Sequence, residues 1–223
     1  MNIILSTYFT SKEDPQRGGN WKCNDFSIIK DWYQSIKKLN LNAIIFHDHC
    51  SDRFINKYST ERISFVYHKP IKDIMNARFR CYYDYIWRHF YKKIYCTDIS
   101  DVVIMKDPFP LIEKDILVCG SEEKLIGEGS FMRESQRRIF NKIMYKDKRL
   151  LNCGIIGANY HILIDLIHEM RKMFNKTGNR PNSDMAIFNQ VVYDNDIELL
   201  TGSEVHSKFG AEETKGNFYF KHK

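Results

Sequence analysis

Two aspartates that directly follow an apolar run have the clearest chemical potential in this sequence. Asp98 and Asp101 lie in the segment 95–109, YCTDISDVVIMKDPF, and a second short apolar run follows them at 102–105. Buried carboxylates are costly unless a cation pairs with them, and their oxygens suit Mg²⁺ or Mn²⁺. A divalent ion held there would also bind a diphosphate and stabilise it as a leaving group. The alternative is that both aspartates only cap a turn or a short helix.

The elements that must position these aspartates alternate between strand-like and helix-like patterns. Short apolar runs predict strands at 2–7, 42–47, 63–68, 93–97, 115–120, 150–157 and 197–200. Apolar residues at helical spacing predict helices at 25–39, 70 to about 90, 162–174 and 184–193. The alternation predicts an α/β domain with a mainly parallel central sheet and helices on both faces. Ligands of such sheets bind beyond the carboxyl ends of the strands, so we expect chemistry after the first, fourth and sixth strands.

Five segments, in order along the chain, resemble the GT-A family of nucleotide-sugar glycosyltransferases. They are 76–85 (NARFRCYYDY), 97–109 (TDISDVVIMKDPF), 151–158 (LNCGIIGA), 183–189 (SDMAIFN) and 205–210 (VHSKFG). In that order they resemble the family's Arg-containing helix, its DxD region, its N-x-G segment, its D-Q-x-x-F-N segment and its C-terminal His loop. The resemblance implies a single Rossmann-like GT-A domain and a small viral or bacterial capsule-type transferase. It also implies a metal-dependent enzyme of the hexosyltransferase type, with the stereochemistry left open.

The resemblance implies a Mn²⁺ or Mg²⁺ cofactor and roles for four residues. Asp98 would contact the donor ribose or the metal, and Asp101 would be the more direct metal ligand. The sequence departs from the strict D-x-D pattern because Ser100 stands at its third position, so the carboxylates are spaced D-x-x-D. Ser100 would then contribute a hydroxyl, or the site would bind metal weakly. His206 would supply a further metal ligand, the alternative being a surface histidine.

Other candidates would bind the nucleotide-sugar donor. By the same resemblance, Thr7 and Tyr8 follow the first strand at the edge that holds base and ribose, where an aromatic ring stacks on a base for about 1–3 kcal/mol. Arg78 would pair with the diphosphate, since a guanidinium binds phosphate in a bidentate manner. Gly154 would allow close approach of a sugar, and Asn152 would hydrogen-bond its hydroxyls. The alternatives are a strand-end loop, an arginine paired with a carboxylate, and a bulged strand.

Asp184 is the candidate for the acceptor side. Its carboxylate would bind the acceptor hydroxyl and, in an inverting enzyme, remove its proton as general base. The alternative is an aspartate that caps the helix beginning there. The predicted partners are a nucleotide diphosphate-sugar donor and a saccharide or glycoconjugate acceptor. Two other functions stay open: an inactive nucleotide-sugar-binding relative, suggested by Ser100, and a metal-dependent phosphohydrolase, which lacks a Gly-rich phosphate loop.

Bulk properties set the remaining expectations. The chain has 223 residues, which suits one domain, predicted at 1–210 and followed by a polar tail at 211–223. The net charge of +6 suits an anionic partner, but no nucleic-acid module is present, so we expect no nucleic acid. No apolar run approaches the ~20 residues of a transmembrane helix. The six cysteines form no C-x-x-C pair and are expected to be free thiols in the cytosol.

Overall fold

The structure of the protein is a computed structural model that describes all residues except 14–18, 72, 114, 210–215 and 223. One central sheet has the strand order β3-β2-β1-β4-β7-β6-β8. Its strands are β1 (Asn2–Tyr8), β2 (Ala43–His47), β3 (Ile63–Tyr67), β4 (Lys93–Thr97), β6 (Ile116–Leu125), β7 (Arg149–Asn159) and β8 (Glu198–Leu200). Strand β7 is antiparallel to β4 and β6, and the other neighbouring strands of this sheet are parallel. The predicted mainly parallel α/β sheet is confirmed.

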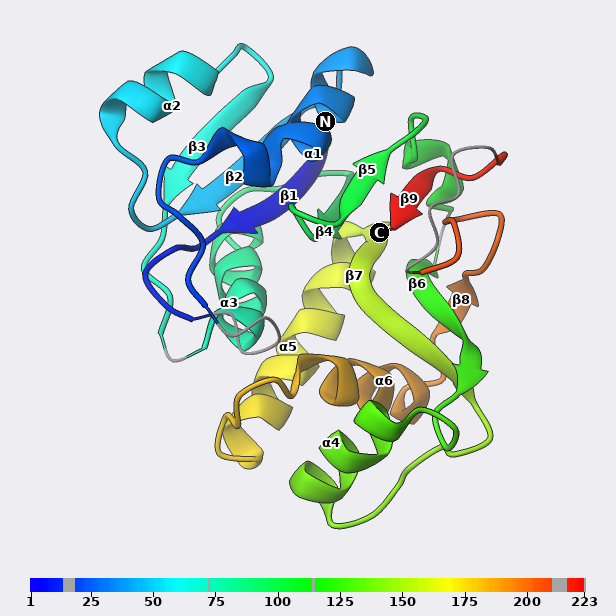
Figure 1. Cartoon of the computed structure of the whole chain (residues 1–223). Helices are drawn as coiled ribbons and strands as arrows, with labels where there is room; N and C mark the ends of the chain where they lie inside the picture. Colours follow the sequence, from blue (N-terminus) through cyan, green and yellow to red (C-terminus); the bar gives the residue numbers. More distant parts are fainter. Residues whose placement is uncertain (14–18, 72, 114, 210–215, 223) are drawn as a thin grey trace.

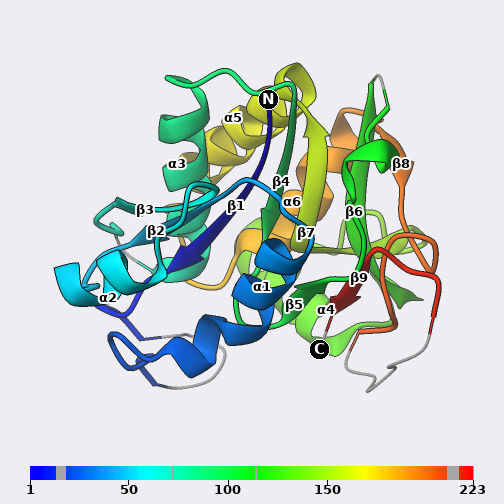
Figure 2. The same cartoon turned by 90° about the horizontal axis from the view of Figure 1, so that it is seen from above.

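Helices cover both faces of the sheet (Figures 1 and 2). They are α1 (Phe26–Lys38), α2 (Asp52–Tyr58), α3 (Ile74–Ile86), α4 (Ser130–Phe140), α5 (Tyr160–Lys176) and α6 (Asp184–Asp194), with a 3₁₀ turn at Phe109–Leu111. The apolar residues of α3, α5 and α6 form the core on one face, and α1 and α2 pack on the other. None of the described helices is both long and apolar enough to cross a membrane.

Capping side chains decide where two of the predicted helices begin. The Asp25 carboxylate accepts a hydrogen bond from the Ser27 amide at 3.0 Å, so α1 starts one residue after the aspartate. The Asp73 carboxylate accepts from the Asn76 amide at 3.0 Å, so α3 begins at Ile74 and not at Pro70 as predicted. Such caps satisfy backbone N–H groups that have no partner within the helix. Helices α2 and α4 are not among the helices predicted from the sequence.

The end of the chain is part of the core. Strand β9 (Phe220–His222) pairs antiparallel with β5 (Val102–Ile104), the short apolar run that follows the two aspartates. Phe218, Phe220 and His222 are buried. This packing differs from the polar tail that the sequence predicts, whereas the division of the chain at residue 210 stays a prediction. Residues 211–215 lie outside the described part of the chain.

The direction of β7 decides which of its residues reach the functional edge. Because β7 is antiparallel to β4, Thr97 at the end of β4 pairs with Ile155, and the Asp98 amide donates to the Gly154 carbonyl at 2.9 Å. The first half of β7 therefore lies at the carboxyl edge of the parallel strands. The sixth predicted strand, 150–157, is β7 in the structure. The expectation that chemistry follows this strand is wrong, since the loop after β7 lies at the opposite edge of the sheet. Strand β6, parallel to β4, ends at the functional edge instead.

Candidate functional site

A cavity of about 460 Å³ lies where β4 ends and β7 begins, and we call it the central cavity. Six residues that the sequence singles out line it: Arg78, Asp98, Asp101, Asn152, Gly154 and Asp184. They come from α3, the end of β4, the start of β7 and the start of α6. The structure thus brings together candidates that are up to 106 residues apart in the sequence.

A narrower pocket of about 50 Å³ adjoins the central cavity. Arg78, Asp98 and Asp101 line both spaces, whereas Thr7 and Ser100 line only the narrow pocket. Both aspartates therefore face the same continuous region, as a shared cation site requires.

Arg78 links the two sides of the central cavity. Its side chain is 7% exposed, and one terminal nitrogen donates to the Asp98 carboxylate. The other donates to Asp184 Oδ2 at 2.7 Å and contacts Cys153 Sγ at 3.2 Å. Burial keeps the Cys153 thiol uncharged by raising its pKa. The guanidinium is thus fixed between two carboxylates, an arrangement in which each buried charge has a partner.

The two aspartates after β4 differ in their surroundings. Burial raises the pKa of Asp98, although the neighbouring Arg78 guanidinium opposes this rise. The Asp98 side chain nevertheless keeps 25% of its surface exposed. Asp101 accepts a hydrogen bond from the Ser100 hydroxyl. Ser100 therefore orients the second carboxylate in this structure, which is a role that the sequence analysis did not assign to it.

A histidine from β9 faces Asp98 across the bare Cα of Gly154. A β-carbon built on Gly154 would lie 2.8 Å from Asp98 Oδ2 and 2.9 Å from His222 Nε2. The absence of a side chain at Gly154 therefore leaves room for the carboxylate and the imidazole. Burial lowers the pKa of His222 to about 4, even though Asp101 opposes this shift, so its ring is neutral at neutral pH. A neutral imidazole is the form that binds metals.

His206 lies elsewhere, although the sequence predicts it as a metal ligand. Its Nε2 accepts a hydrogen bond from the Ser121 amide at 2.9 Å, and its Nδ1 lies 2.6 Å from the Ser207 carbonyl. Both ring nitrogens are therefore used by the backbone. His206 lines a neighbouring cavity and not the central one. The histidine that lies near Asp98 is His222, not His206.

Tyr8 does not present a ring for base stacking. Its side chain is 0% exposed, and its hydroxyl donates to the Lys22 carbonyl. The structure therefore contradicts the predicted stacking role, because a buried ring offers no free face. Trp21, which stacks on Tyr8 with ring centroids 6.1 Å apart, lines the narrow pocket instead. Trp21 is half-buried, so part of its surface is available to a ligand.

Comparison with known proteins identifies the fold. No protein-family model and no curated protein matches the sequence. The structure is similar to the crystal structure of galactosyltransferase LgtC in complex with donor and acceptor sugar analogues. The match has a TM-score of 0.63 and 13% sequence identity, and covers 100% of this chain and 86% of the other. This chain has a GT-A fold. At this identity the likeness shows the fold alone.

Within the GT-A fold, the donor atoms at the central cavity fit a divalent cation in type. Asp98 and Asp101 offer carboxylate oxygens and His222 a neutral imidazole, which are ligands that manganese accepts. Among the described residues, however, no three His, Cys, Asp or Glu side chains are gathered closely enough to hold a metal by themselves. The residues present therefore suit an ion that shares its coordination with substrate phosphates, as Mg²⁺ commonly does.

Three residues that lie at this edge of the GT-A fold were not predicted from the sequence: Trp21, Glu122 and His222. For His222 a signal exists, because Phe218, Phe220 and His222 alternate with more polar residues as a half-buried strand does. Trp21 lies before the first predicted helix in a segment without periodicity, so no pattern points to it. Glu122 belongs to the end of β6, which extends five residues beyond the predicted strand.

Proposed function

We propose that this chain is a metal-assisted glycosyltransferase that moves a sugar from a nucleoside diphosphate-sugar to a saccharide or glycoconjugate acceptor. The observation that carries the proposal is that Asp98 and Asp101, at the end of β4, line one cavity with Arg78 and Asp184. The fold shared with LgtC, whose structure contains donor and acceptor sugar analogues, supports it. Carboxylates at strand ends suit a divalent cation that is also bound by the phosphates of a nucleotide-sugar.

The donor would lie along the carboxyl edge of the sheet. Its base and ribose would lie over the mouth of the narrow pocket beside Trp21 and Thr7, and its diphosphate would lie at Asp98 and Asp101. The sugar would then enter the central cavity beside Asn152. The Asn152 Oδ1 accepts from the Gly154 amide at 2.8 Å, which orients the side chain and leaves its NH₂ to donate to a sugar hydroxyl.

We propose Mn²⁺ or Mg²⁺ as the cofactor, held mainly by the phosphates of the bound donor and completed by side chains drawn from Asp98, Asp101 and His222. When bound, the ion would neutralise charge on the departing diphosphate. The hydrogen bond from Ser100 keeps Asp101 oriented, and the Arg78 guanidinium holds Oδ1 of Asp98. His222 replaces His206 in this proposal, because both ring nitrogens of His206 are already engaged.

Asp184 would position the sugar and would not serve as general base. Its Oδ2 already accepts hydrogen bonds from Arg78 at 2.7 Å and from Cys153 at 3.5 Å. Taking up a proton at that oxygen would break its charge-assisted bond to Arg78. A carboxylate held in this way still accepts a hydrogen bond from a sugar hydroxyl, so we propose that Asp184 fixes the orientation of the substrate.

A nucleotide-sugar-binding relative without activity is the second candidate. Arg78 already pairs with both Asp98 and Asp184, and the described residues form no complete metal cage. A site built in this way would bind a nucleotide beside Trp21 and Thr7 without an ion. It predicts nucleotide binding that EDTA does not change and no release of nucleoside diphosphate from nucleotide-sugars.

A reducing compartment such as the cytosol is part of the proposal. All six cysteines are free thiols in the structure. Four of them are buried, and burial raises the pKa of Cys81, Cys96, Cys119 and Cys153, which makes these thiols unreactive.

The deciding experiment incubates the purified chain with a panel of nucleotide-sugars, with and without Mn²⁺, and measures released nucleoside diphosphate. We expect release from at least one donor, and we expect it to stop when EDTA is added. Calorimetry of nucleotide binding with and without EDTA separates the two candidates, because EDTA should not change binding to the inactive relative. Absence of both release and nucleotide binding across the panel would overturn the proposal. Release of inorganic phosphate from simple phosphoesters would point to a phosphohydrolase.

Asp101→Asn tests the ion-binding carboxylate. The variant keeps the size of the side chain but removes its charge, so Mn²⁺-dependent transfer should fall by orders of magnitude while the thermal midpoint changes little. Asp196→Asn is the matched control, because Asp196 is exposed and its φ of 47° suits asparagine. Equal turnover in Asp101→Asn and Asp196→Asn would remove Asp101 from the site.

A further inference from the structure

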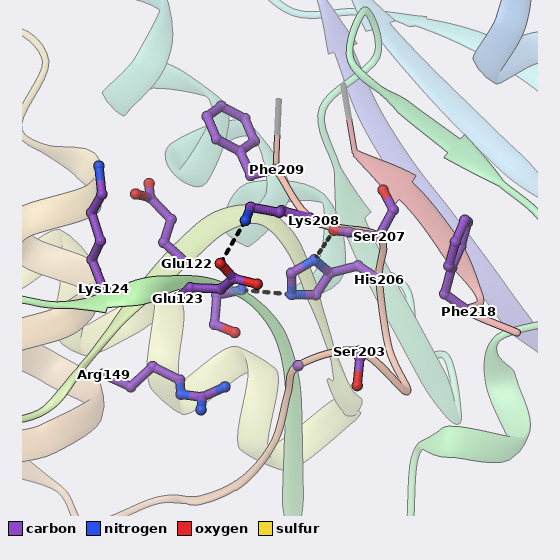
Figure 3. Close-up of a pocket in the computed structure, with 12 residues that line it drawn as sticks. Glu122, Glu123, Lys124, Arg149, Ser203, His206, Ser207, Lys208, Phe209 and Phe218 are labelled. Carbon is purple, nitrogen blue, oxygen red and sulfur yellow. Dashed lines mark hydrogen bonds and ion pairs between the residues drawn. The ribbon is translucent and has the colours of Figure 1, made fainter. Parts of the chain in front are cut away.

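A second, larger cavity of about 640 Å³ adjoins the central one, and we call it the lateral cavity. Its described wall consists of residues 121–124 at the end of β6, Arg149 at the start of β7, residues of the segment 202–209, and Phe218. Figure 3 shows these side chains around the open space. Its volume falls in the range of ligand sites, roughly 300–1,000 Å³.

The two cavities meet at two side chains. Glu122 and Phe209 line both of them, so a ligand in the lateral cavity reaches the place where the donor sugar is proposed to lie. Phe209 is 45% exposed, and its ring lies edge-on to His222 at 4.8 Å between centroids. An exposed aromatic ring at such a junction provides an apolar surface for the CH groups of a sugar.

Most polar groups of the lateral cavity already have partners. Glu123 pairs with Lys208 at 2.7 Å, and the ring nitrogens of His206 bond to the backbone. Burial lowers the pKa of His206, so its ring adds no charge to this wall at neutral pH. Among the described residues, three charged groups of this cavity form no ion pair: Glu122, Lys124 and Arg149.

Arg149 is the group best placed to receive a ligand. No carboxylate of the described residues lies within ion-pair distance of its exposed guanidinium, unlike that of Arg78. The guanidinium lies close over the loop at Gly202, where an added β-carbon would be 3.4 Å from one of its nitrogens. Thr201 anchors this loop through a hydrogen bond to the Cys119 carbonyl at 2.7 Å. A guanidinium held beside an anchored loop is suited to a carboxylate or phosphate, which it binds in a bidentate manner.

The charges also set a direction for the ligand. In Figure 3 the Glu122 carboxylate points to the same side as the Phe209 ring, and the Arg149 guanidinium lies on the other side. Glu122 is half-buried, and burial raises its pKa although Lys124 opposes the rise. A hydroxyl group fits beside Glu122, near the central cavity, whereas an acidic group would be repelled there and attracted to Arg149.

We infer that the lateral cavity is the acceptor site of this chain and that it takes a saccharide bearing an acidic group, a carboxylate or a phosphate, bound by Arg149. The inference rests on the proposed transferase function. The acidic group lies at Arg149, the sugar ring lies against Phe209, and a hydroxyl of the sugar reaches the central cavity past Glu122.

The experiment measures binding of three probes to the full chain by ligand-observed NMR: methyl glucuronoside, glucose 6-phosphate and methyl glucoside. We expect at least one acidic probe to bind about tenfold more tightly than the neutral one, as a hydrogen bond to a charged group allows. The Arg149→Gln variant should lose this preference. Comparing the two acidic probes shows whether the site takes a carboxylate or a phosphate.

Arg137→Gln is the matched control, because Arg137 is exposed on α4 and lines neither cavity. It should keep the full preference. Equal binding of acidic and neutral probes, or a preference that survives in Arg149→Gln, would overturn the inference. Calorimetry of UDP and GDP binding on the same samples tests the proposed function separately, since Arg149 lies outside the donor pocket. Intact nucleotide binding without acidic preference therefore removes only the acceptor assignment.

Discussion

The central and the lateral cavity share Glu122 and Phe209, yet they treat charge in opposite ways. In the central cavity Arg78 is 5% exposed and is bonded to Asp98 and Asp184. In the lateral cavity Arg149 is exposed, and no carboxylate of the described residues pairs with it. The same side-chain type is thus a fixed part of one wall and an available group in the other.

The difference follows from the cost of burying charge. A buried guanidinium must have carboxylate partners inside the protein, because leaving it unpaired costs several kcal/mol. An exposed guanidinium remains solvated and gains only about 0–1 kcal/mol from a surface partner, so it can stay unpaired until a ligand arrives. Charged groups that are paired within the chain, such as Arg78, shape the site, whereas unpaired groups such as Arg149 are available to bind a ligand. Three pairs of substitutions test this distinction.

Arg78→Met gives the largest expected effect. It removes the partner of two buried or half-buried carboxylates, so we expect the free energy of unfolding to fall by about 3–5 kcal/mol, with transfer activity lost. Urea unfolding followed by circular dichroism measures the change. Arg149→Met is the comparison and should alter the unfolding free energy by about 0.5 kcal/mol or less.

Arg78→Lys sharpens the same test. Lysine keeps the charge but not the two-pronged geometry, so it should recover part of the stability and little of the activity. Similar losses of stability in Arg78→Met and Arg149→Met would contradict the distinction between the two cavities.

The sequence could predict the site residues at the ends of the parallel strands better than those that come from other parts of the chain. The alternation of strands and helices predicts the sheet, and a parallel sheet brings the ends of β1 and β4 to one edge, which places Thr7, Asp98 and Asp101. Such positions follow from local patterns. The antiparallel direction of β7 does not, because a continuous apolar run has the same pattern in either direction.

The other residues of the site depend on contacts between segments that are distant in the sequence. His222 reaches Asp98 only because β9 pairs with β5, more than a hundred residues earlier in the chain. His206 directly follows Val205 and His222 lies two residues after Phe220, so both are close to apolar residues near the end of the sequence, and only the contacts of the fold distinguish them. For the same reason, the sequence points to Tyr8 because it follows the first predicted strand, whereas burial of that strand end removes its ring from the pocket.

The two histidines provide the second test. His222→Ala should weaken Mn²⁺ affinity, measured with bound nucleoside diphosphate, by at least the roughly 10–100-fold that loss of an outer-shell partner costs. The unpartnered Nδ1 of His222 among the described residues means that few internal hydrogen bonds are lost with it. His206→Ala should leave Mn²⁺ affinity unchanged and lower stability, because it strips the Ser121 amide of its acceptor. The reverse pattern would restore His206 as the metal ligand.

Trp21, which lines the narrow pocket, and Tyr8, on which Trp21 stacks, provide the smallest effect. Trp21→Ala should weaken nucleotide binding by about 1 kcal/mol, the low end for base stacking, because one face of the ring already packs on Tyr8. Tyr8→Phe keeps that packing and removes the hydroxyl that donates to the Lys22 carbonyl and accepts from the Asp25 amide, so it should lower stability and leave nucleotide affinity as it is. Calorimetric titration with UDP and GDP measures both. A larger loss of affinity in Tyr8→Phe than in Trp21→Ala would mean that the base contacts Tyr8. It would also mean that a buried, hydrogen-bonded side chain becomes accessible to a ligand, which contradicts the distinction between groups paired within the chain and groups available to bind.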